Sequence, residues 1–313
     1  MKRHPSNYRP VSVRAGQLAT VSLVTFLAFT AGCARNASVV GKTAYFSVVR
    51  TQPPAGVSPA DEVHVKKHCV FGKPRLDPKW NYGPVDLVAH DGYVLLHSAT
   101  EKIPLWVCEY VVKNQLTGTL TRRDNFRPDP LLKPGRRAEL TDYKKSGYNR
   151  GHQAPAGDQT KDEKLKDETF CLSNMAPQLP ALNQQVWSQL EAAIRNWLTE
   201  RGDGYVITGP MFYDPKEEDA HTATGVIAHK VIGPDGVAVP THFYKIVVAK
   251  DARGQWESIA FVLENRKYPK PYDFAKYIRS IDWIQQRTGI DFMPELDVLE
   301  QKRLEQNATR LWN

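Results

Sequence analysis

Two apolar runs constrain the fold of this chain more than any other sequence feature. Residues 242–248 and 258–263 are almost continuously hydrophobic, and a short polar stretch, residues 251–254, lies between them. Uninterrupted runs of this length are typical of strands that are buried on both faces of a sheet. The short connection predicts that the two strands pair as an antiparallel hairpin at the centre of that sheet.

The remaining pattern predicts further strands and helices around this hairpin. Strands are expected at residues 85–88 and 93–96 around an Asp91-Gly92 turn, and at 106–112, 169–172 and 205–212, with an edge strand at 228–232. A strong helix is expected from Pro180, because apolar residues recur with a helical period until glycines follow at 202 and 204. Shorter helices are expected within 272–288 and 296–313. The predicted class is α+β, with a mixed or antiparallel central sheet and flanking helices.

The first 32 residues are predicted to be a signal peptide. Four cations without any acid precede an apolar run over residues 18–31, which is shorter than a spanning helix of about 20 residues. Ala31-Gly32-Cys33 resembles the lipobox of bacterial lipoproteins, although Thr30 stands where an aliphatic residue is usual. We therefore expect an exported protein that is periplasmic or anchored to the membrane through a lipid on Cys33. Ordinary secretion and an uncleaved membrane anchor are the alternatives.

Composition divides the rest of the chain into three parts. Residues 33–62 lack a period and are predicted to be a tether, 63–300 to be the folded domain, and 301–313 to be a helical tail. Around the start of the domain, Val63 and Val65 alternate with polar residues as in a strand, and His64 and His68 have metal-ligand spacing only on a helix. Structural or surface histidines are favoured there, since no third ligand lies nearby.

Charge and cysteine content give limited information about partners. The four cations of the signal peptide account for half of the formal net charge of +8, so any attraction to phosphate in the exported part is local. Without Cys33, three cysteines remain, of which Cys69 and Cys108 are one possible disulfide pair. Oligomeric state cannot be derived from this composition.

Residues 148–158 contain the strongest candidate for a catalytic motif. Gly151 permits a close backbone approach, and Pro155 favours extended geometry before it, so His152 lies on a stiff non-helical segment. Such a histidine suits a general base, and Arg150 shares its face if the segment is extended, which suits a phosphate. A tight turn with a structural histidine and a solvated arginine explains the same residues equally well.

The predicted helix carries two polar residues beside its apolar stripe. On a regular helix, Asn183 and Glu191 would lie about 80° apart around the axis and about 12 Å apart along it. Polar groups at the edge of a buried stripe are costly without partners. A hydrogen-bonded asparagine and a surface salt bridge would satisfy them, as would a common ligand.

Several motifs occur in a fixed order along the chain. They are Arg123, Asn-Arg-Gly-His at 149–152, Ser-Asn-Met-Ala-Pro-Gln at 173–178, Asn-Gln-Gln-Val-Trp-Ser-Gln-Leu-Glu at 183–191 and Thr-Gly-Pro at 208–210. This set resembles the DNA/RNA non-specific endonucleases, which are ββα-metal nucleases. Residues 243–245 and 280–294 are similar to later blocks of that family, so the likeness covers roughly 64–295. Asn149 departs from the aspartate of the family's signature.

The resemblance implies a role for each matching residue. His152 looks like the general base that activates water, Asn183 like the one direct protein ligand of Mg²⁺ or Mn²⁺, and Glu191 like the holder of a water of that ion. Arg123 resembles the arginine that stabilises the phosphate in the transition state, and Arg122 beside it is the alternative. Arg150 is a further catalytic candidate, and Asn174 a substrate-binding candidate. A metal between the His152 segment and the helix then accounts for Asn183 and Glu191 together.

The implied activity is Mg²⁺-dependent hydrolysis of DNA and RNA without sequence or sugar specificity. The matching residues address phosphate, and phosphate contacts position a nucleic acid without reading its bases. Two alternatives remain at this point. Asn149 is compatible with a catalytically weakened scaffold that only binds nucleic acid, and the modest charge is compatible with a phosphodiesterase acting on small substrates.

Overall fold

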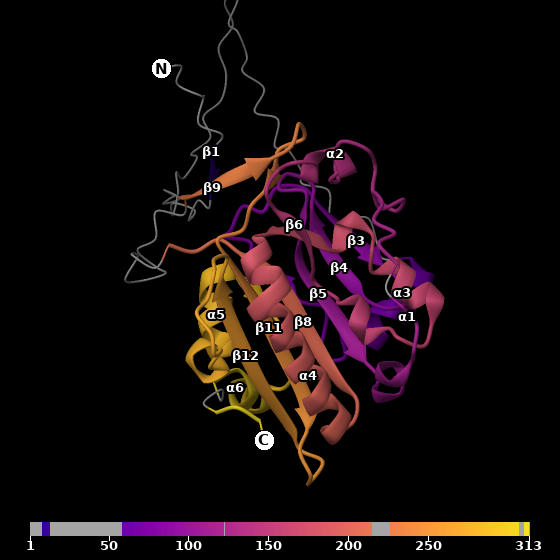
Figure 1. The fold of residues 1–313 in the computed structure, drawn as a ribbon. Helices are drawn as coiled ribbons and strands as arrows, with labels where there is room; N and C mark the ends of the chain where they lie inside the picture. Colours follow the sequence, from indigo (N-terminus) through magenta and orange to yellow (C-terminus); the bar gives the residue numbers. More distant parts are fainter. Residues whose placement is uncertain (1–7, 13–57, 122, 215–225, 307–309, 313) are drawn as a thin grey trace, which may run out of the picture. The chain divides into compact units, whose positions relative to one another are not determined.

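An antiparallel six-stranded sheet forms the centre of the protein (Figure 1). The structure is a computed structural model, which describes residues 8–12, 58–121, 123–214, 226–306 and 310–312. In spatial order, the strands of the sheet are β12 (Trp256–Glu264), β11 (His242–Lys250), β8 (Gly204–Met211), β5 (Ile103–Val111), β4 (Val94–Ser98) and β3 (Val85–Ala89). The predicted α+β class is confirmed.

The predicted apolar hairpin is present, but it is not central. Strands β11 and β12 pair from His242 opposite Glu264 to Lys250 opposite Trp256. Strand β12 lies at the edge of the sheet, whereas the sequence predicted a central strand. Its apolar run arises because both of its faces are covered, and coverage of the faces does not require a neighbour on each side.

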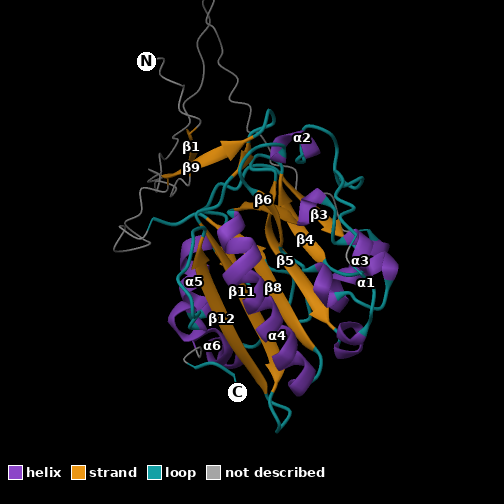
Figure 2. Cartoon of the chain, in the orientation of Figure 1, coloured by secondary structure: helices purple, strands orange, loops and turns teal. Residues whose placement is uncertain are grey.

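Helices cover the two faces of the hairpin end of the sheet. Helix α4 (Ser188–Arg201) packs on one face, and α5 (Ile281–Thr288) and α6 (Val298–Gln306) pack on the other (Figure 2). Alternate residues of β11 accordingly enter two cores. Phe243 and Val247 lie in the core beneath α4, while Tyr244 and Ile246 lie in the core beneath α5.

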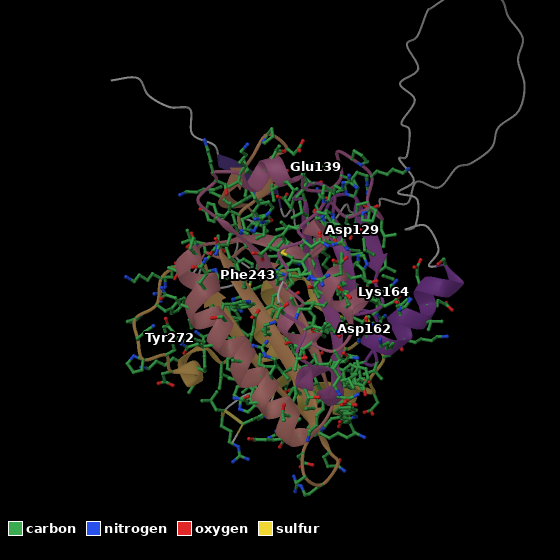
Figure 3. The ribbon with its side chains drawn as sticks, turned by 45° about the vertical axis from the view of Figure 1, so that its right-hand side comes forward. Asp129, Glu139, Asp162, Lys164, Phe243 and Tyr272 are labelled. Atoms are coloured by element: carbon green, nitrogen blue, oxygen red, sulfur yellow. The ribbon has the colours of Figure 1, made fainter. Side chains whose placement is uncertain are left out.

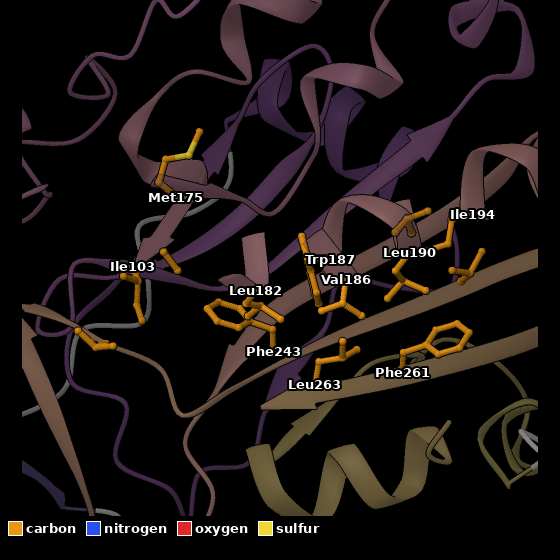
Figure 4. Packing of buried hydrophobic residues seen from close by; sticks show 14 of the residues in the cluster. Ile103, Met175, Leu182, Val186, Trp187, Leu190, Ile194, Phe243, Phe261 and Leu263 are labelled. Carbon is orange, nitrogen blue, oxygen red and sulfur yellow. The ribbon is translucent and has the colours of Figure 1, made fainter. Parts of the chain in front are cut away.

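Helix α4 and the turn before it bury one continuous apolar stripe. Figure 4 shows five of its residues facing Phe243, Phe261 and Leu263 of the sheet; they are Leu182, Val186, Trp187, Leu190 and Ile194. All five are at most 2% exposed. Truncating one such leucine to alanine costs about 2–5 kcal/mol of stability, so this contact fixes the helix firmly on the sheet.

Shorter elements complete the described part of the chain. Two-stranded sheets are formed by β6 (Asn149–His152) with β7 (Met175–Gln178) and by β2 (Arg75–Leu76) with β13 (Ile290–Asp291). The short helices are α2 (Leu140–Tyr143), α3 (Glu163–Glu168) and the 3₁₀ turns Lys113–Thr117, Ala156–Asp158, Leu172–Asn174 and Phe274–Tyr277. The connection between β5 and β6 is largely irregular in its described residues, as predicted.

A separate three-stranded sheet contains part of the predicted signal peptide. Strand β9 (Val226–Ile232) lies between β1 (Tyr8–Ser12) and β10 (Val237–Ala238), so it is not the edge strand that the sequence predicted. The apolar run 18–31, Cys33 and the tether up to residue 57 lie outside the described residues. Among those that are described, every helix is too short or too polar for a membrane span.

Residues 63–68 form a helix, whereas the sequence predicted a strand. Helix α1 (Pro59–His68) begins four residues before the predicted domain boundary. The side chain of Ser58 accepts a hydrogen bond from the Asp61 amide, and acidic residues in the first turn and basic residues in the last favour the helix dipole. Val63 is 65% exposed. The alternating valines were therefore misleading, because they do not alternate between core and solvent.

His68 anchors helix α1 to the sheet as a structural residue. Its Nδ1 accepts from the Tyr110 amide at 3.0 Å, and its Nε2 therefore donates to the Asp91 carbonyl at 3.0 Å. Burial lowers the pKa of His68 to about 3, so the ring is neutral. The structure supports the structural interpretation of this histidine over metal binding.

The strand predicted at residues 169–172 is also wrong. Residues 169–170 form a turn, Cys171 an isolated bridge and Leu172 the start of a 3₁₀ turn, and strand β7 begins only at Met175, where a turn was expected. Pro177 is tolerated in β7 because this strand pairs only with β6 in its two-stranded sheet.

The three described cysteines are reduced and buried, and two of them are neighbours. The Cys108 thiol lies within hydrogen-bonding reach of the Cys69 thiol, which together with burial keeps its pKa well above the usual value. We predict that equilibration with oxidised glutathione links Cys69 to Cys108 and leaves Cys171 unlinked from both. Non-reducing peptide mapping by mass spectrometry checks this, and a Cys171-containing link as the main product would contradict it.

Candidate active site

His152 lies at the end of strand β6, against two aromatic rings. Its ring centroid is 5.6 Å from that of Phe126 and 5.1 Å from that of Phe170, and the residue is 8% exposed. The Arg150 guanidinium carbon lies 4.0 Å from the Phe126 centroid. Phe126 thus contacts both residues, which confirms that Arg150 and His152 share one face of the strand.

Gly151 is required by the partner strand β7. A Cβ atom at this position would lie 2.2 Å from Oε1 of the buried Gln178 side chain. A side chain at residue 151 would therefore displace the buried Gln178 side chain of the paired strand. The glycine of the motif therefore serves the close approach that the sequence predicted.

Asn174 braces the His152 segment and does not face a substrate. It is fully buried, and its side chain accepts from the Ala154 amide at 2.9 Å and donates to the carbonyls of Ala154 and Thr169 at 2.9 and 3.0 Å. Its backbone carbonyl accepts from the Gln153 amide at 3.0 Å. The predicted substrate contact is corrected, because these hydrogen bonds occupy the amide and burial excludes phosphate.

Asn183 projects from a π-helical turn, η4 (Leu182–Trp187), that leads directly into α4. Such wide turns are rare and occur frequently at functional sites. Such a turn also changes the angle between Asn183 and Glu191 around the helix axis. The value of about 80° expected for a regular helix therefore does not apply. The Asn183 side chain is half-buried and has no hydrogen-bond partner among the described residues, so its amide oxygen is available to a ligand.

Glu191 belongs to a group of ionisable side chains that the sequence analysis missed. Burial raises its pKa to about 7, Lys245 opposes this rise, Asp158 adds to it, and Arg195 opposes it. Arg195 Nη1 donates to Asp158 Oδ1 at 2.9 Å. A sequence signal existed for Lys245, since it is a lone cation in the apolar run of β11.

Arg123 lies on the surface near Phe170, one of the two aromatic rings that contact His152. Its guanidinium is 76% exposed and pairs with Glu163. It lines a hollow together with Leu120, Thr121, Glu163, Lys166, Asp167 and Phe170, and the last of these contacts His152. An exposed ion pair contributes about 0–1 kcal/mol, so Arg123 can exchange Glu163 for a phosphate. Arg122 lies outside the described residues.

A separate polar cluster is formed by His90, Asp129, Cys171 and Ser173. His90 Nε2 is 2.9 Å from Asp129 Oδ2, Ser173 donates to the same oxygen, and Cys171 lies beside them. Figure 3 labels Asp129 on the same side of the ribbon as Asp162 and Lys164, with Tyr272 on the opposite side. This cluster could accommodate an ion, but it contains none of the predicted site residues, and hydrogen bonds already join His90 and Ser173 to Asp129.

The oxygen donors near α4 fit a hard divalent cation better. Mg²⁺ takes oxygen ligands and keeps several waters, so it needs few direct protein ligands. Asn183 offers a half-buried amide oxygen that has no partner among the described residues, and Glu191 offers a carboxylate on the helix that follows. The residues present are therefore compatible with one ion held mainly by Asn183.

Comparisons with known proteins identify the family of this chain. A family model described as DNA/RNA non-specific endonuclease matches residues 81–299. The chain belongs to the DNA/RNA non-specific endonuclease family. Mitochondrial endonuclease G of Homo sapiens is 35% identical over 68% of this chain and 71% of its own length, and a nuclease of Syncephalastrum racemosum is 34% identical over 69% and 70%.

A solved structure shows the same fold in this family. The crystal structure of the EndoG/EndoGI complex contains a chain that is 29% identical, with a TM-score of 0.66 over 77% of this chain and 94% of that one. The family resemblance and the ββα-metal nuclease fold are thereby confirmed. As a member of a non-specific endonuclease family, the protein is a phosphodiester-hydrolysing nuclease.

The raised pKa of Glu191 predicts a measurable loss of stability with rising pH. Between the ordinary glutamate pKa of 4.5 and the raised pKa of about 7, the folded metal-free protein holds a proton on Glu191 that the unfolded chain releases. The free energy of unfolding therefore falls as pH rises through this range, by at most about 3 kcal/mol for this group. Glu191→Gln should remove that part of the slope in urea unfolding with a chelator present.

Glu305 of α6 provides the matched control for this prediction. Its pKa is also raised to about 7 by burial, and it lies on the opposite face of the sheet. Glu305→Gln should remove a similar part of the slope while leaving nuclease activity intact. A Glu191→Gln variant that retains the full wild-type slope would contradict the assignment.

Proposed function

We propose that this protein is a divalent-metal-dependent endonuclease that hydrolyses DNA and RNA without sequence preference, with Mg²⁺ as the ion. The observation that carries the proposal is the Asn183 amide oxygen, half-buried and without a described protein partner, on the turn that follows β7. Strand β7 pairs with the strand that carries His152. The chain therefore leads directly from the histidine's partner strand into the helix with the oxygen donors.

His152 is assigned the role of general base. Its ring packs against Phe126 and Phe170, which also contact each other, and Gly151 and Asn174 fix the backbone on either side. A base held in position accepts a proton from water in line with the scissile phosphate. Arg123, once released from Glu163, pairs with the phosphate oxygens, and Arg150 adds a second cation on the His152 side.

Asn183 is assigned as the metal ligand, with Glu191 orienting a water nearby. The ion, when bound, supplies positive charge against the negative charge that develops on the phosphate and the leaving oxygen. The roles assigned to these residues address the phosphate, the attacking water and the metal, and none of them is a contact with a base edge. Weak preference between DNA and RNA follows.

Export and lipid anchoring at Cys33 are part of the proposal. They are supported by the cationic start, the apolar run at 18–31 and the Ala-Gly-Cys sequence. A periplasmic or membrane-anchored nuclease is favoured over a freely secreted one. We predict that Cys33→Ser moves the protein from the membrane fraction to the soluble fraction of the producing cells, and an unchanged distribution would contradict the lipid anchor.

Digestion assays with a base-deficient variant test the catalytic proposal. The purified protein in Mg²⁺ should degrade plasmid DNA and RNA, and His152→Ala should lower the rate by about 100- to 10,000-fold, as expected for loss of a general base. His64→Ala, at a half-buried histidine on helix α1, is the matched control and should retain activity.

Two outcomes would favour the alternatives. Binding of DNA without cleavage in any divalent metal would indicate a weakened scaffold, to which Asn149 could contribute. Cleavage of bis-p-nitrophenyl phosphate without cleavage of polymers would indicate a small-substrate phosphodiesterase. Equal digestion by His152→Ala and wild type would exclude the assigned base.

A further inference from the structure

Lys245 is a buried lysine at the junction between the His152 segment and helix α4. It is 1% exposed and lies in β11, on the face that packs against α4. Its Nζ donates to Thr208 Oγ1 at 2.7 Å and to the Gln153 carbonyl at 3.3 Å. Gln153 is the residue that follows His152 in the chain. The ammonium group therefore contacts the backbone immediately after the proposed base.

The charges around Lys245 come from three other elements. Glu191 and Arg195 face it from α4, Asp158 from the 3₁₀ turn after β6, and Glu109 from β5. Burial lowers the pKa of Lys245, and Glu191, Asp158 and Glu109 oppose that effect, in decreasing order. The hydrogen bonds to Thr208 and Gln153, together with these acidic side chains, offset part of the cost of burying the ammonium group.

The Lys245 side chain has a role that is distinct from the backbone pairing of the sheet. Backbone pairing holds β11 to β8 and β12 along its whole length, and that pairing does not involve the Lys245 side chain. The ammonium group instead joins the segment after His152 to Thr208, and its Nζ lies 5.2 Å from the ring centroid of Trp187 in the turn that leads into α4. Its loss should therefore disturb the alignment of the site more than the sheet.

We propose that Lys245 is a positioning residue that holds the His152 segment in register with the Asn183–Glu191 helix. This inference rests on the proposed function for its catalytic meaning. Lys245 is not itself a catalytic residue, because burial keeps its ammonium group from substrate. Its contribution is to fix where the base lies relative to the groups on α4.

The test compares Lys245→Met with Arg201→Met. The methionine keeps most of the side-chain volume at residue 245 and removes the charge and both hydrogen bonds. Arg201, in the last turn of α4, pairs with Glu257 at 2.6 Å and lies 4.1 Å from the Trp312 ring centroid. Arg201→Met thus removes a partly buried cation from α4, the helix that carries Glu191, without touching the site.

We predict that Lys245→Met lowers kcat by about 100-fold, because a displacement of about 1 Å in a catalytic group has this effect. KM should change by less than about threefold, since the arginines that contact phosphate are intact. The His152 ring resonances should shift in NMR spectra, and backbone amides of residues 152–158 should exchange faster. Arg201→Met should lower the melting temperature while kcat and these signals stay close to wild type.

Thr208→Val keeps the test decisive if Lys245→Met does not fold. This isosteric change removes one hydrogen bond of Lys245 and keeps the charge, so kcat should fall by roughly 3- to 10-fold at unchanged KM. An unchanged kcat in the folded Lys245→Met variant, or in Thr208→Val where that variant does not fold, overturns the inference. A change confined to KM also overturns it.

Failure of the inference and failure of the proposed function have different signatures. Wild-type protein that digests nucleic acid, with His152→Ala inactive and Lys245→Met fully active, rejects only the role of Lys245. Wild-type protein without activity rejects the proposed function, and the His152 resonances and amide exchange of residues 152–158 then still decide whether Lys245 positions the segment.

Discussion

The packing of the stripe from Leu182 to Ile194 on the α4 face of the sheet is the contact on which the site depends. Trp187 and Phe243 meet at 5.7 Å between ring centroids, and both are fully buried. This contact fixes the helix in position and rotation, so the π-helical turn carries Asn183 at a fixed place. A helix that could slide or rotate on its sheet would not present a metal ligand reproducibly.

The His152 segment is held in a different way, by polar groups. Asn174 bonds to the backbone of Ala154 and Thr169, and Gly151 lies directly against Gln178. These contacts are local to β6, β7 and the connection between them. Lys245 is placed where this polar bracing meets the apolar packing of α4, which explains why a buried charge is retained among hydrophobic strands.

Patterns with a strong period predicted the fold well, and short or mixed patterns did not. The β11–β12 hairpin, the β3–β4 pair and helix α4 were found because long apolar periods reflect which face is buried. Helix α1 was mistaken for a strand because the Ser58 cap and the terminal charges outweigh two alternating valines. Asn174 was mistaken for a substrate contact because a motif does not reveal whether its amide points to solvent or to backbone.

By itself, the sequence determined the α+β class, the order of the motifs and the residues capable of base, metal and phosphate chemistry, since these follow from periodicity and side-chain type. Only the tertiary structure decided what those residues contact. Burial and hydrogen bonding turned Asn174 into a brace, left the Asn183 amide available, and gathered Lys245, Glu109, Asp158 and Arg195 around Glu191. The physical reason is that these charges come from β5, β11, α4 and the turn after β6. No local pattern records which side chains a sheet and a helix will bring together.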